Sequence, residues 1–309
     1  WNPPQGVLVV EIAGWGIDTV STINYKQGSF FHCLGLNPCI DYDVILKEDG
    51  DGTVVVPSAL AMSTSSESVT RYWVNLKKYD TVLSVGRDHK DILEVSNLLD
   101  FIGDTLKNST TQLTDYTYLS SYSPTSTPEK KLNYFLHSPL SLDLYDEQGH
   151  HTGVSTTTGY VENQIPGAYY RTFGEVKYIT APASTTLHLV MNGQASGYFT
   201  LDVQEAIGDL ITATTSFVDI PAATTTAVSM EFTDGTIAHA SPLRVDVDVN
   251  GTTDFSLVPK VGDIVTLPLP DTTSPATLAS TTGTLGANGW YTSNALVTLT
   301  ATATGSGVA

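Results

Sequence analysis

The chain is poor in positive charge. Among its 309 residues, 14 are lysine or arginine and 32 are aspartate or glutamate, which gives a formal net charge of −18 at pH 7. Nucleic acids and anionic membranes are bound through basic patches, so this balance argues against both as partners. It favours an exported protein whose surface repels its own copies. We therefore expect a secreted or cell-surface location.

Long apolar runs are also missing. No segment approaches the roughly 20 apolar residues that a membrane-spanning helix requires. The length allows two or three domains, each with a core of its own. The chain starts at Trp1 rather than at a methionine, and Trp1-Asn-Pro-Pro leads directly into an apolar run. We expect it to be an internal piece of a longer precursor, so that missing targeting signals carry no information.

Cysteine is scarce, because the chain has only Cys33 and Cys39. Glycine and proline in the loop between them let the two Cα atoms come close. In an oxidising compartment this spacing favours a local disulfide, and the alternative is two free thiols in a surface loop. A zinc site is not expected here, because no second pair of cysteines or histidines stands at ligand spacing.

The first 107 residues have the texture of an α/β domain. Near-continuous apolar runs are typical of strands buried on both faces of a mostly parallel sheet with helices. From His89 to Leu106, apolar residues instead recur at helical spacing, which predicts a helix. Residues 17–41 are expected to be irregular. The expected strands cover residues 6–13, 43–46, 72–76 and 80–85.

The sequence changes character after a polar linker at 108–131. Short alternating runs then recur at regular spacing, with Asn-Gly and Asp-Gly turn pairs between or beside them. This predicts an all-β sandwich over 132–268, with one face of each sheet packed and the other wet. A proline-rich linker follows at 269–276. Residues 277–309 offer two or three strands, too few to close another sandwich.

One acidic turn and one histidine carry the candidate chemistry. The strand at 43–46 runs into Glu48-Asp49-Gly50-Asp51-Gly52, and His89 opens the helical pattern downstream. A carboxylate at a strand end and a histidine at a strand-to-helix junction are two parts of an acyl-transfer triad. Asp49 is the alternative acid. The competing interpretation is a solvated turn and a histidine that caps a helix.

These residues also resemble a known family. The acidic turn is similar to the one that carries the triad aspartate in α/β-hydrolase lipases of the lecithin:cholesterol acyltransferase and lysosomal phospholipase A2 group. The resemblance implies that Asp51 is the triad acid and His89 the triad histidine. It covers about the first 107 residues and is carried by Glu48-Asp49-Gly50-Asp51-Gly52-Thr53-Val54, by His89 with Asp91-Ile92-Leu93, and upstream by Val7 to Tyr25 with Gly14-Trp15-Gly16 and Thr19.

The nucleophile of such a triad is missing. Chain order in that family is serine, aspartate, histidine, and no Gly-x-Ser-x-Gly elbow occurs in this sequence. The resemblance therefore places the serine upstream of Trp1, in the nucleophile-bearing half of the same precursor. It implies a serine ester hydrolase or acyltransferase that acts on a lipid or other ester, requires no cofactor and is inactive in this piece alone.

A second group of acidic residues suggests a metal. Oxygen ligands at positions 1, 3, 5 and 9, with glycine at position 6, match the first part of a calcium loop. Position 12, where a bidentate glutamate is expected, is Leu257. Calcium is the one cofactor candidate. Its ligands would be Asp246, Asp248, Asn250 and Asp254.

A plain hairpin competes with the calcium loop and is favoured. Its type I′ turn would be Asn250-Gly251. Val245, Val247 and Val249 would then point to one side, and such strict alternation suits a strand better than a coiled loop. The six histidines besides His89 show no partner pattern and are expected to be surface or strand residues: His32, His137, His150, His151, His188 and His239.

The last segment resembles bacterial surface Ig-like repeats, through Asp271-Thr-Thr-Ser-Pro275, Gly286-Ala-Asn-Gly-Trp-Tyr291 and Val297-Thr-Leu-Thr-Ala-Thr302. Two further functions therefore stay open. One is a non-catalytic subunit of a surface layer or extracellular filament that self-assembles through the C-terminal β domain. The other is a carbohydrate- or cell-wall-binding module, whose exposed aromatic residues would be Tyr169, Tyr170 and Trp290.

Overall fold

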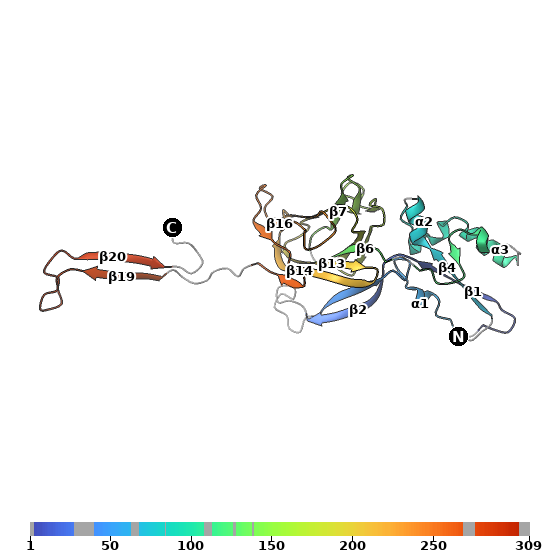
Figure 1. Ribbon diagram of the computed structural model, residues 1–309, viewed down its shortest axis with the longest axis horizontal. Coiled ribbons are helices and arrows are strands. Elements are labelled where there is room, and N and C mark those ends of the chain that lie inside the picture. The colour runs from blue at the N-terminus through green and yellow to red at the C-terminus, as the bar shows by residue number, and fades with distance from the viewer. Residues whose placement is uncertain are drawn as a thin grey trace. The chain divides into compact units, whose positions relative to one another are not determined.

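The fold was analysed in a computed structural model of the chain (Figure 1). The structure describes residues 3–27, 40–62, 68–83, 85–107, 113–125, 128–137, 139–267 and 276–302. The predicted disulfide between Cys33 and Cys39 lies outside these residues. Contacts divide the chain into two compact units, Trp1–Thr266 and Leu267–Ala309. No helix in the described ranges is long and apolar enough to cross a bilayer.

Two sheets form a β-sandwich in the first unit (Figure 1). All neighbouring strands are antiparallel except β14 and β18. The six-stranded sheet has the order β10 (Tyr169–Phe173), β11 (Val176–Pro182), β6 (Lys130–His137), β13 (Gly197–Ile207), β14 (Leu210–Ala222) and β18 (Asp263–Val265). The seven-stranded sheet has the order β17 (Phe255–Leu257), β16 (Leu243–Asp246), β15 (Ala227–Phe232), β12 (Leu187–Asn192), β7 (Asp143–Asp146), β8 (His151–Val154) and β9 (Val161–Asn163).

The sandwich core follows from the alternation that the sequence displays. In β12 the fully buried residues are Leu187, Leu189 and Met191, which project from one face of the strand. Between the sheets, Tyr134 of β6 meets Phe232 of β15 edge to face, with ring centroids 5.3 Å apart. The expected β-sandwich is therefore present, with strands at the expected alternating runs.

A small sheet with short helices precedes the sandwich. β1 (Val9–Trp15) is parallel to β4 (Val69–Asn75), and β4 is antiparallel to β5 (Leu119–Ser120). A core that includes Ile17, Val74 and Leu98 lies against these elements. The helical segments are α1 (Val56–Ala59), α2 (Leu76–Leu83), α3 (Leu98–Leu106) and the two 3₁₀ helices η1 (His89–Glu94) and η2 (Leu113–Asp115).

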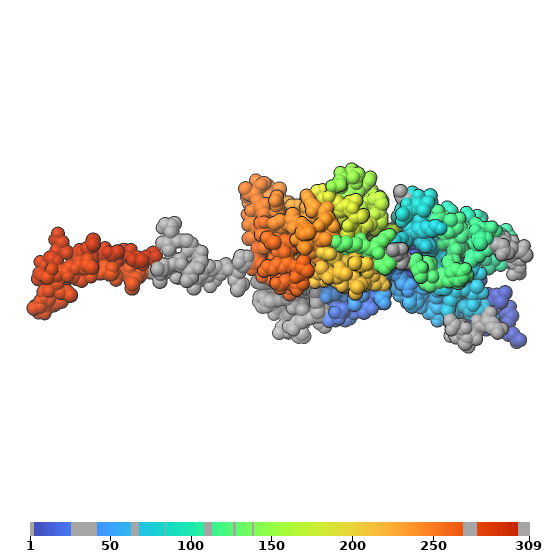
Figure 2. All heavy atoms as spheres, in the orientation of Figure 1, coloured from blue at the N-terminus to red at the C-terminus, as the bar shows by residue number. Residues whose placement is uncertain are grey.

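A two-stranded hairpin covers the outer face of the six-stranded sheet. β2 (Thr19–Gln27) pairs with β3 (Ile40–Lys47), and Val44 of β3 packs on Phe135, Val176 and Tyr178 of β6 and β11. Figure 2 shows the blue atoms of β2 directly against the yellow strands of the sandwich. β6 is therefore buried on both faces, by the second sheet on one side and by this hairpin on the other.

The expected partial α/β-hydrolase fold is wrong. In the described part of residues 3–125 the only parallel pair of strands is β1 with β4, so there is no parallel-sheet hydrolase core. The apolar run at 43–46 belongs to an antiparallel hairpin, where Val44 is buried and Ile45 is exposed. Apolar runs of this length fit either a parallel strand or a hairpin that packs on a neighbour, and periodicity does not separate them.

Two local predictions in the same region also fail. Residues expected to be irregular form β2, whose β-branched residues suit a strand. The segment 80–85, expected to be a strand, falls largely in α2, because Leu76, Tyr79 and Asp80 are buried at helical spacing. The single helix expected from His89 is broken between η1 and α3, where Asn97 adopts a left-handed φ of 68°.

The described part of the second unit is one antiparallel hairpin. β19 (Ala276–Thr282) pairs with β20 (Leu296–Thr302). Large apolar side chains are exposed on it, including Leu278, Leu296 and Leu299. A two-stranded sheet with exposed apolar residues is at best marginally stable by itself.

Candidate functional site

The acidic turn after β3 is built around the carboxylate of Asp51. This carboxylate is buried, and its Oδ1 accepts hydrogen bonds from the backbone N–H groups of Thr53 (3.1 Å) and Val54 (2.7 Å). Thr19 bridges the turn to the end of β1. Its Oγ1 donates to the carbonyl of Ile17 and accepts from the N–H of Gly52, both at 2.8 Å. The orientation of the carboxylate is therefore fixed by several polar contacts.

Close packing brings the turn against β1. Ile17 and Asp51 form an isolated parallel bridge, which continues from the end of β1. A Cβ placed at Gly14 would lie 2.6 Å from the Cβ of Asp51 and 3.0 Å from Cδ1 of Ile92. Glycine is required at position 14 because any side chain there would displace the turn.

His89 meets this carboxylate at the first residue of η1. Its Nδ1 lies 2.9 Å from Oδ2 of Asp51, and its backbone N–H donates to the Asp51 carbonyl at 2.9 Å. A capping box starts the helix, because the Asp88 side chain accepts from the N–H of Lys90 while its own N–H donates to Asp91. The two predicted site residues, 38 positions apart, are therefore in direct contact.

The arrangement leaves one ring nitrogen of His89 available. The imidazole side chain is 50% exposed, whereas Asp51 is 5% exposed. An ionised carboxylate can only accept a hydrogen bond, so Nδ1 of His89 donates to Asp51. In the neutral ring Nε2 is then the acceptor. Nε2 makes no hydrogen bond to any residue in the described ranges. The imidazole is therefore half exposed, and a buried carboxylate contacts its other nitrogen.

Asp49, the alternative acid, does not take this position. Its backbone carbonyl accepts a hydrogen bond from the N–H of Val56, and no hydrogen bond joins Asp49 to His89 within the described residues. Partial burial and the nearby carboxylate of Asp209 raise the pKa of Asp49 above its usual value. Asp51 is the acid partner of the histidine.

A groove of about 900 Å³ is lined by sequence neighbours of this pair, although neither Asp51 nor His89 is among the lining residues. Gly52 and Thr53 of the acidic turn line it, as do Asp88 and Lys90 on either side of His89. Most of the other lining residues come from β2 and β10, with side chains that include Tyr25, Phe173 and Arg171. Nη2 of Arg171 lies 3.4 Å from Oδ2 of Asp88, and the guanidinium packs against Gly52. Positive charge is therefore present at the groove of an otherwise acidic chain.

Asp80 fastens the loop before His89 to the sandwich. One carboxylate oxygen accepts the N–H of Arg87 and the other accepts the hydroxyl of Tyr169 in β10, both at 2.9 Å. Burial raises the pKa of Asp80 from 3.8 to about 6. Burial and the adjacent Asp80 carboxylate hold the pKa of Tyr169 well above its usual range. Sequence reasoning missed Asp80 and Arg171, because nothing in the local pattern links them to His89.

Several histidines for which the sequence showed no partner pattern also contact carboxylates. His150 Nδ1 lies 2.7 Å from Asp146 Oδ2, in the turn between β7 and β8. His151 is largely buried, and its two ring nitrogens contact Glu162 (2.7 Å) and Asp143 (3.0 Å). His137 is also buried, with its ring toward Asp43 and Asp202.

The predicted calcium residues are Asp246, the last residue of β16, and three residues of the eight-residue loop that joins it to β17. Carboxylate oxygens of Asp246, Asp248 and Asp254 lie within 4.8 Å of one another. Asp246 Oδ2 accepts the N–H of Gly251, and Asp254 Oδ2 accepts that of Val247. Asn250 Oδ1 accepts from Thr252 within the loop.

The favoured hairpin is present as β16 and β17, but its expected type I′ turn at Asn250-Gly251 is wrong. That turn requires positive φ at both central residues, whereas positive φ occurs at Val249 (54°) and Gly251 (84°). The strands end at Asp246 and resume at Phe255, so β16 and β17 form a hairpin with a longer loop. Calcium binding there stays a prediction. It is checked by comparing the melting temperature of the chain with and without chelator.

The aromatic residues suggested for carbohydrate binding are not a surface set. Tyr170 is buried, and Tyr169 is partly buried and bonded to Asp80. Trp290 is 79% exposed but belongs to the second unit. The expectation that Tyr169 and Tyr170 form an exposed platform is wrong.

No family model, curated protein or solved structure matches this chain. These comparisons therefore give no support to the resemblance to lipases.

Proposed function

We propose that Asp51 and His89 are the acid and base of an exported serine-type ester hydrolase or acyltransferase, whose nucleophile comes from outside this chain. The observation that supports this is the 2.9 Å contact between His89 Nδ1 and Asp51 Oδ2, with the carboxylate buried and the imidazole half exposed. A buried carboxylate behind a half-exposed imidazole is the arrangement that acyl-transfer triads use.

The chemistry assigns one role to each residue. His89 accepts the proton of an attacking hydroxyl at Nε2, and in the next step it gives that proton to the leaving group. Asp51 holds the imidazole in the tautomer that has its proton on Nδ1, and it stabilises the imidazolium that forms. The backbone donors Thr53 and Val54 keep the Asp51 carboxylate in place during both steps.

The groove favours an ester with both apolar and polar parts. Phe173, Tyr178 and Tyr25 offer aromatic surface, while Lys90 and Arg171 offer positive charge to an anionic or oxygen-rich group. Lipid and soluble esters share this chemistry. A panel of esters with varied acyl length and headgroup charge distinguishes them.

The test is fluorophosphonate labelling of the full-length polypeptide that contains this segment, followed by peptide mass spectrometry. We expect a labelled serine outside this chain, and esterase turnover that falls by about 10³-fold or more in His89→Ala and Asp51→Asn. The matched controls are His150→Ala and Asp146→Asn, because that pair has nearly the same distance and exposure.

Two results would contradict the proposal. One is full turnover in a folded His89→Ala protein. The other is an equal loss in the His150→Ala control, which would show that the effect is structural. Circular dichroism of each variant separates a lost function from a lost fold.

A second candidate function is a structural subunit of a surface assembly. It is favoured by the β19–β20 hairpin, whose two strands pair with no third strand among the described residues and which exposes Leu278, Leu296 and Leu299. Strand edges of this kind pair with another chain, and we take the partner to be a second copy. Sedimentation should then show concentration-dependent association that Leu278→Ser with Leu299→Ser removes; a strictly monomeric chain would rule it out.

A further inference from the structure

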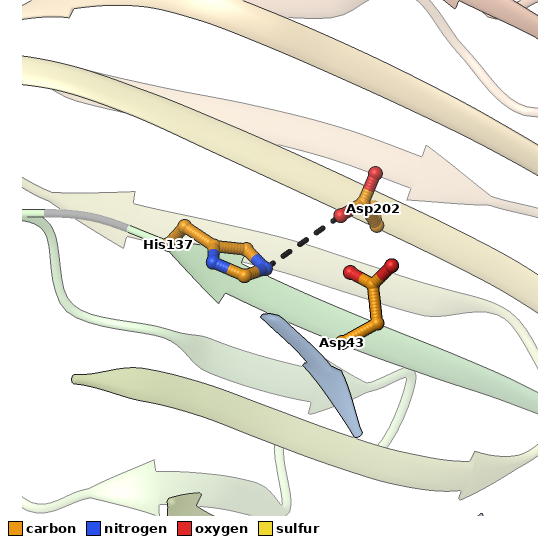
Figure 3. A group of neighbouring side chains, drawn as sticks. All are labelled: Asp43, His137 and Asp202. Atoms are coloured by element: carbon orange, nitrogen blue, oxygen red, sulfur yellow. Dashed lines mark ion pairs between the residues drawn. The ribbon is translucent and has the colours of Figure 1, made fainter. Parts of the chain in front are cut away.

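Three side chains from three separate strands converge on the outer face of the six-stranded sheet (Figure 3). Asp43 comes from β3, His137 from the end of β6, and Asp202 from β13. Figure 3 shows the histidine ring and both carboxylates turned toward one another, and their ligand atoms all lie within 4.8 Å of each other. We propose that these residues bind a divalent transition-metal ion such as Zn²⁺.

Strand register places the three residues together. In the six-stranded sheet His137 stands opposite Thr200, and Asp202 stands opposite Phe135, so His137, Phe135 and Asp202 project from the same face. β3 crosses this face, because Val44 packs on Phe135. Its neighbour Asp43 is thereby brought to the other two. The cluster forms only where the hairpin meets the sandwich.

The distance between His137 and Asp202 suits a shared ion. Nε2 of His137 lies 3.7 Å from Oδ2 of Asp202, which is longer than a hydrogen bond. Two donor atoms that each lie about 2.1 Å from a tetrahedral metal are about 3.4 Å apart.

The site also has space and an appropriate set of donors. A hollow of about 180 Å³ is lined by Asp43, His137 and Asp202, enough for an ion and several waters. One imidazole nitrogen and two carboxylate oxygens suit Zn²⁺, Mn²⁺ or Fe²⁺, whereas Ca²⁺ and Mg²⁺ prefer oxygen alone. The Tyr42 ring lies edge-on to His137, with centroids 6.4 Å apart, which restricts the imidazole.

The bound ion would fasten the β2–β3 hairpin to the sandwich. β2, the other strand of this hairpin, supplies one wall of the groove beside His89. Metal binding would therefore stabilise the groove without taking part in the chemistry of Asp51 and His89. It does not depend on the function proposed for that pair.

The test uses the whole chain after treatment with EDTA and dialysis. Zinc chloride is titrated by calorimetry in the presence of excess calcium, which occupies oxygen-only sites. We expect one zinc per chain, a higher melting temperature with zinc, and an X-ray absorption spectrum with nitrogen and oxygen ligands only. The substitutions Asp43→Asn and Asp202→Asn should each weaken zinc binding by more than about 100-fold.

Asp143→Asn is the matched control, because it alters an aspartate beside a buried histidine that this proposal does not use. It should leave zinc affinity unchanged. The proposal is overturned if the folded wild-type chain binds no zinc, or if Asp43→Asn and Asp202→Asn bind it as tightly as the wild type does. The cluster would then be a purely side-chain contact between one histidine and two aspartates.

Discussion

The pairs Asp51–His89 and Asp146–His150 have nearly the same geometry and are built in different ways. The Nδ1–Oδ2 distances are 2.9 and 2.7 Å, the histidines are 50% and 49% exposed, and both aspartates are 5% exposed. The second pair needs only the turn between β7 and β8, where Asp146 also accepts backbone N–H groups from Gln148 and His150. The first joins residues 38 positions apart.

An aspartate–histidine contact alone is therefore weak support for catalysis. A tight turn produces one from local hydrogen bonds. The surroundings distinguish Asp51–His89. Gly14 of β1 packs closely against the acidic turn, and buried Asp80 accepts a hydrogen bond from the Tyr169 hydroxyl. Residues on both sides of His89 also line a groove. The geometry of Asp51–His89 therefore depends on distant parts of the chain, and changes at those parts should reach His89 and spare His150.

The largest effect on stability is expected from Lys131→Ala. Lys131 Nζ contacts both carboxylate oxygens of Asp18, at 2.6 and 2.8 Å, and both side chains are largely buried. Burial raises the pKa of Asp18 even beside the lysine. Removal of the lysine leaves a buried carboxylate without its partner, which should cost about 3–5 kcal/mol in urea unfolding.

The same variant separates the two pairs. Asp18 follows Ile17, whose backbone bridges to Asp51, so the imidazole signals of His89 should shift in NMR spectra while those of His150 stay unchanged. Lys130→Ala is the matched control: Lys130 lies 3.7 Å from Glu205 and is more exposed, so it should cost less than about 1 kcal/mol. Equal costs for the two lysines would show that the Asp18 contact is unimportant.

Gly14→Ala should have the next largest effect. The new Cβ would lie 2.6 Å from the Cβ of Asp51, so the acidic turn must move, at a cost of about 1–3 kcal/mol. Chemical denaturation measures the cost, and NMR should again show a change at His89 alone. The control is Gly103→Ala in α3, where nothing lies within 4 Å and alanine should stabilise the helix by about 0.5–1 kcal/mol. A neutral Gly14→Ala would mean that the turn yields freely.

Asp80 should make stability fall as pH rises. Its pKa is about 6 in the folded chain and 3.8 ordinarily, so the folded state binds more protons between these values. The stabilisation that protonated Asp80 provides is fully present below about pH 4 and is lost as pH rises through 6. Unfolding measured at several pH values should show this slope in the wild type and a smaller one in Asp80→Asn. An unchanged slope would assign it to another group.

The sequence sufficed where the information was local. Alternating runs predicted the sandwich strands, and apolar residues at helical spacing predicted a helical start at His89. The contact of Asp51 with His89 was also predicted, although the fold expected around it was wrong. Sheet direction was not predictable, since the apolar run at 43–46 is compatible with a parallel strand and with a hairpin packed on β6.

Clusters of residues from distant parts of the chain could not be predicted from the sequence, for a related reason. Asp43, His137 and Asp202 carry no common spacing, and only the packing of β3 across β6 and β13 brings them together. Arg171 and Asp80 reach the neighbourhood of His89 in the same way. Asp146 and His150 are the opposite case, because one short turn of the chain holds both residues.

The smallest effect is expected from Asp146→Asn, and its pH dependence has the opposite sign to that of Asp80. Burial alone would raise the pKa of Asp146, but hydrogen bonds from the His150 ring and from the backbone of His150 and Gln148 lower it below 3.8. The stabilisation is present above that value and is lost as pH falls through the folded pKa. Because His150 is half exposed, the pair should contribute about 0.2–1 kcal/mol. Acid unfolding of Asp146→Asn should begin from a slightly lower stability and fall less steeply, while esterase turnover of the full-length protein is unaffected; a marked loss of turnover would erase the distinction between the two pairs.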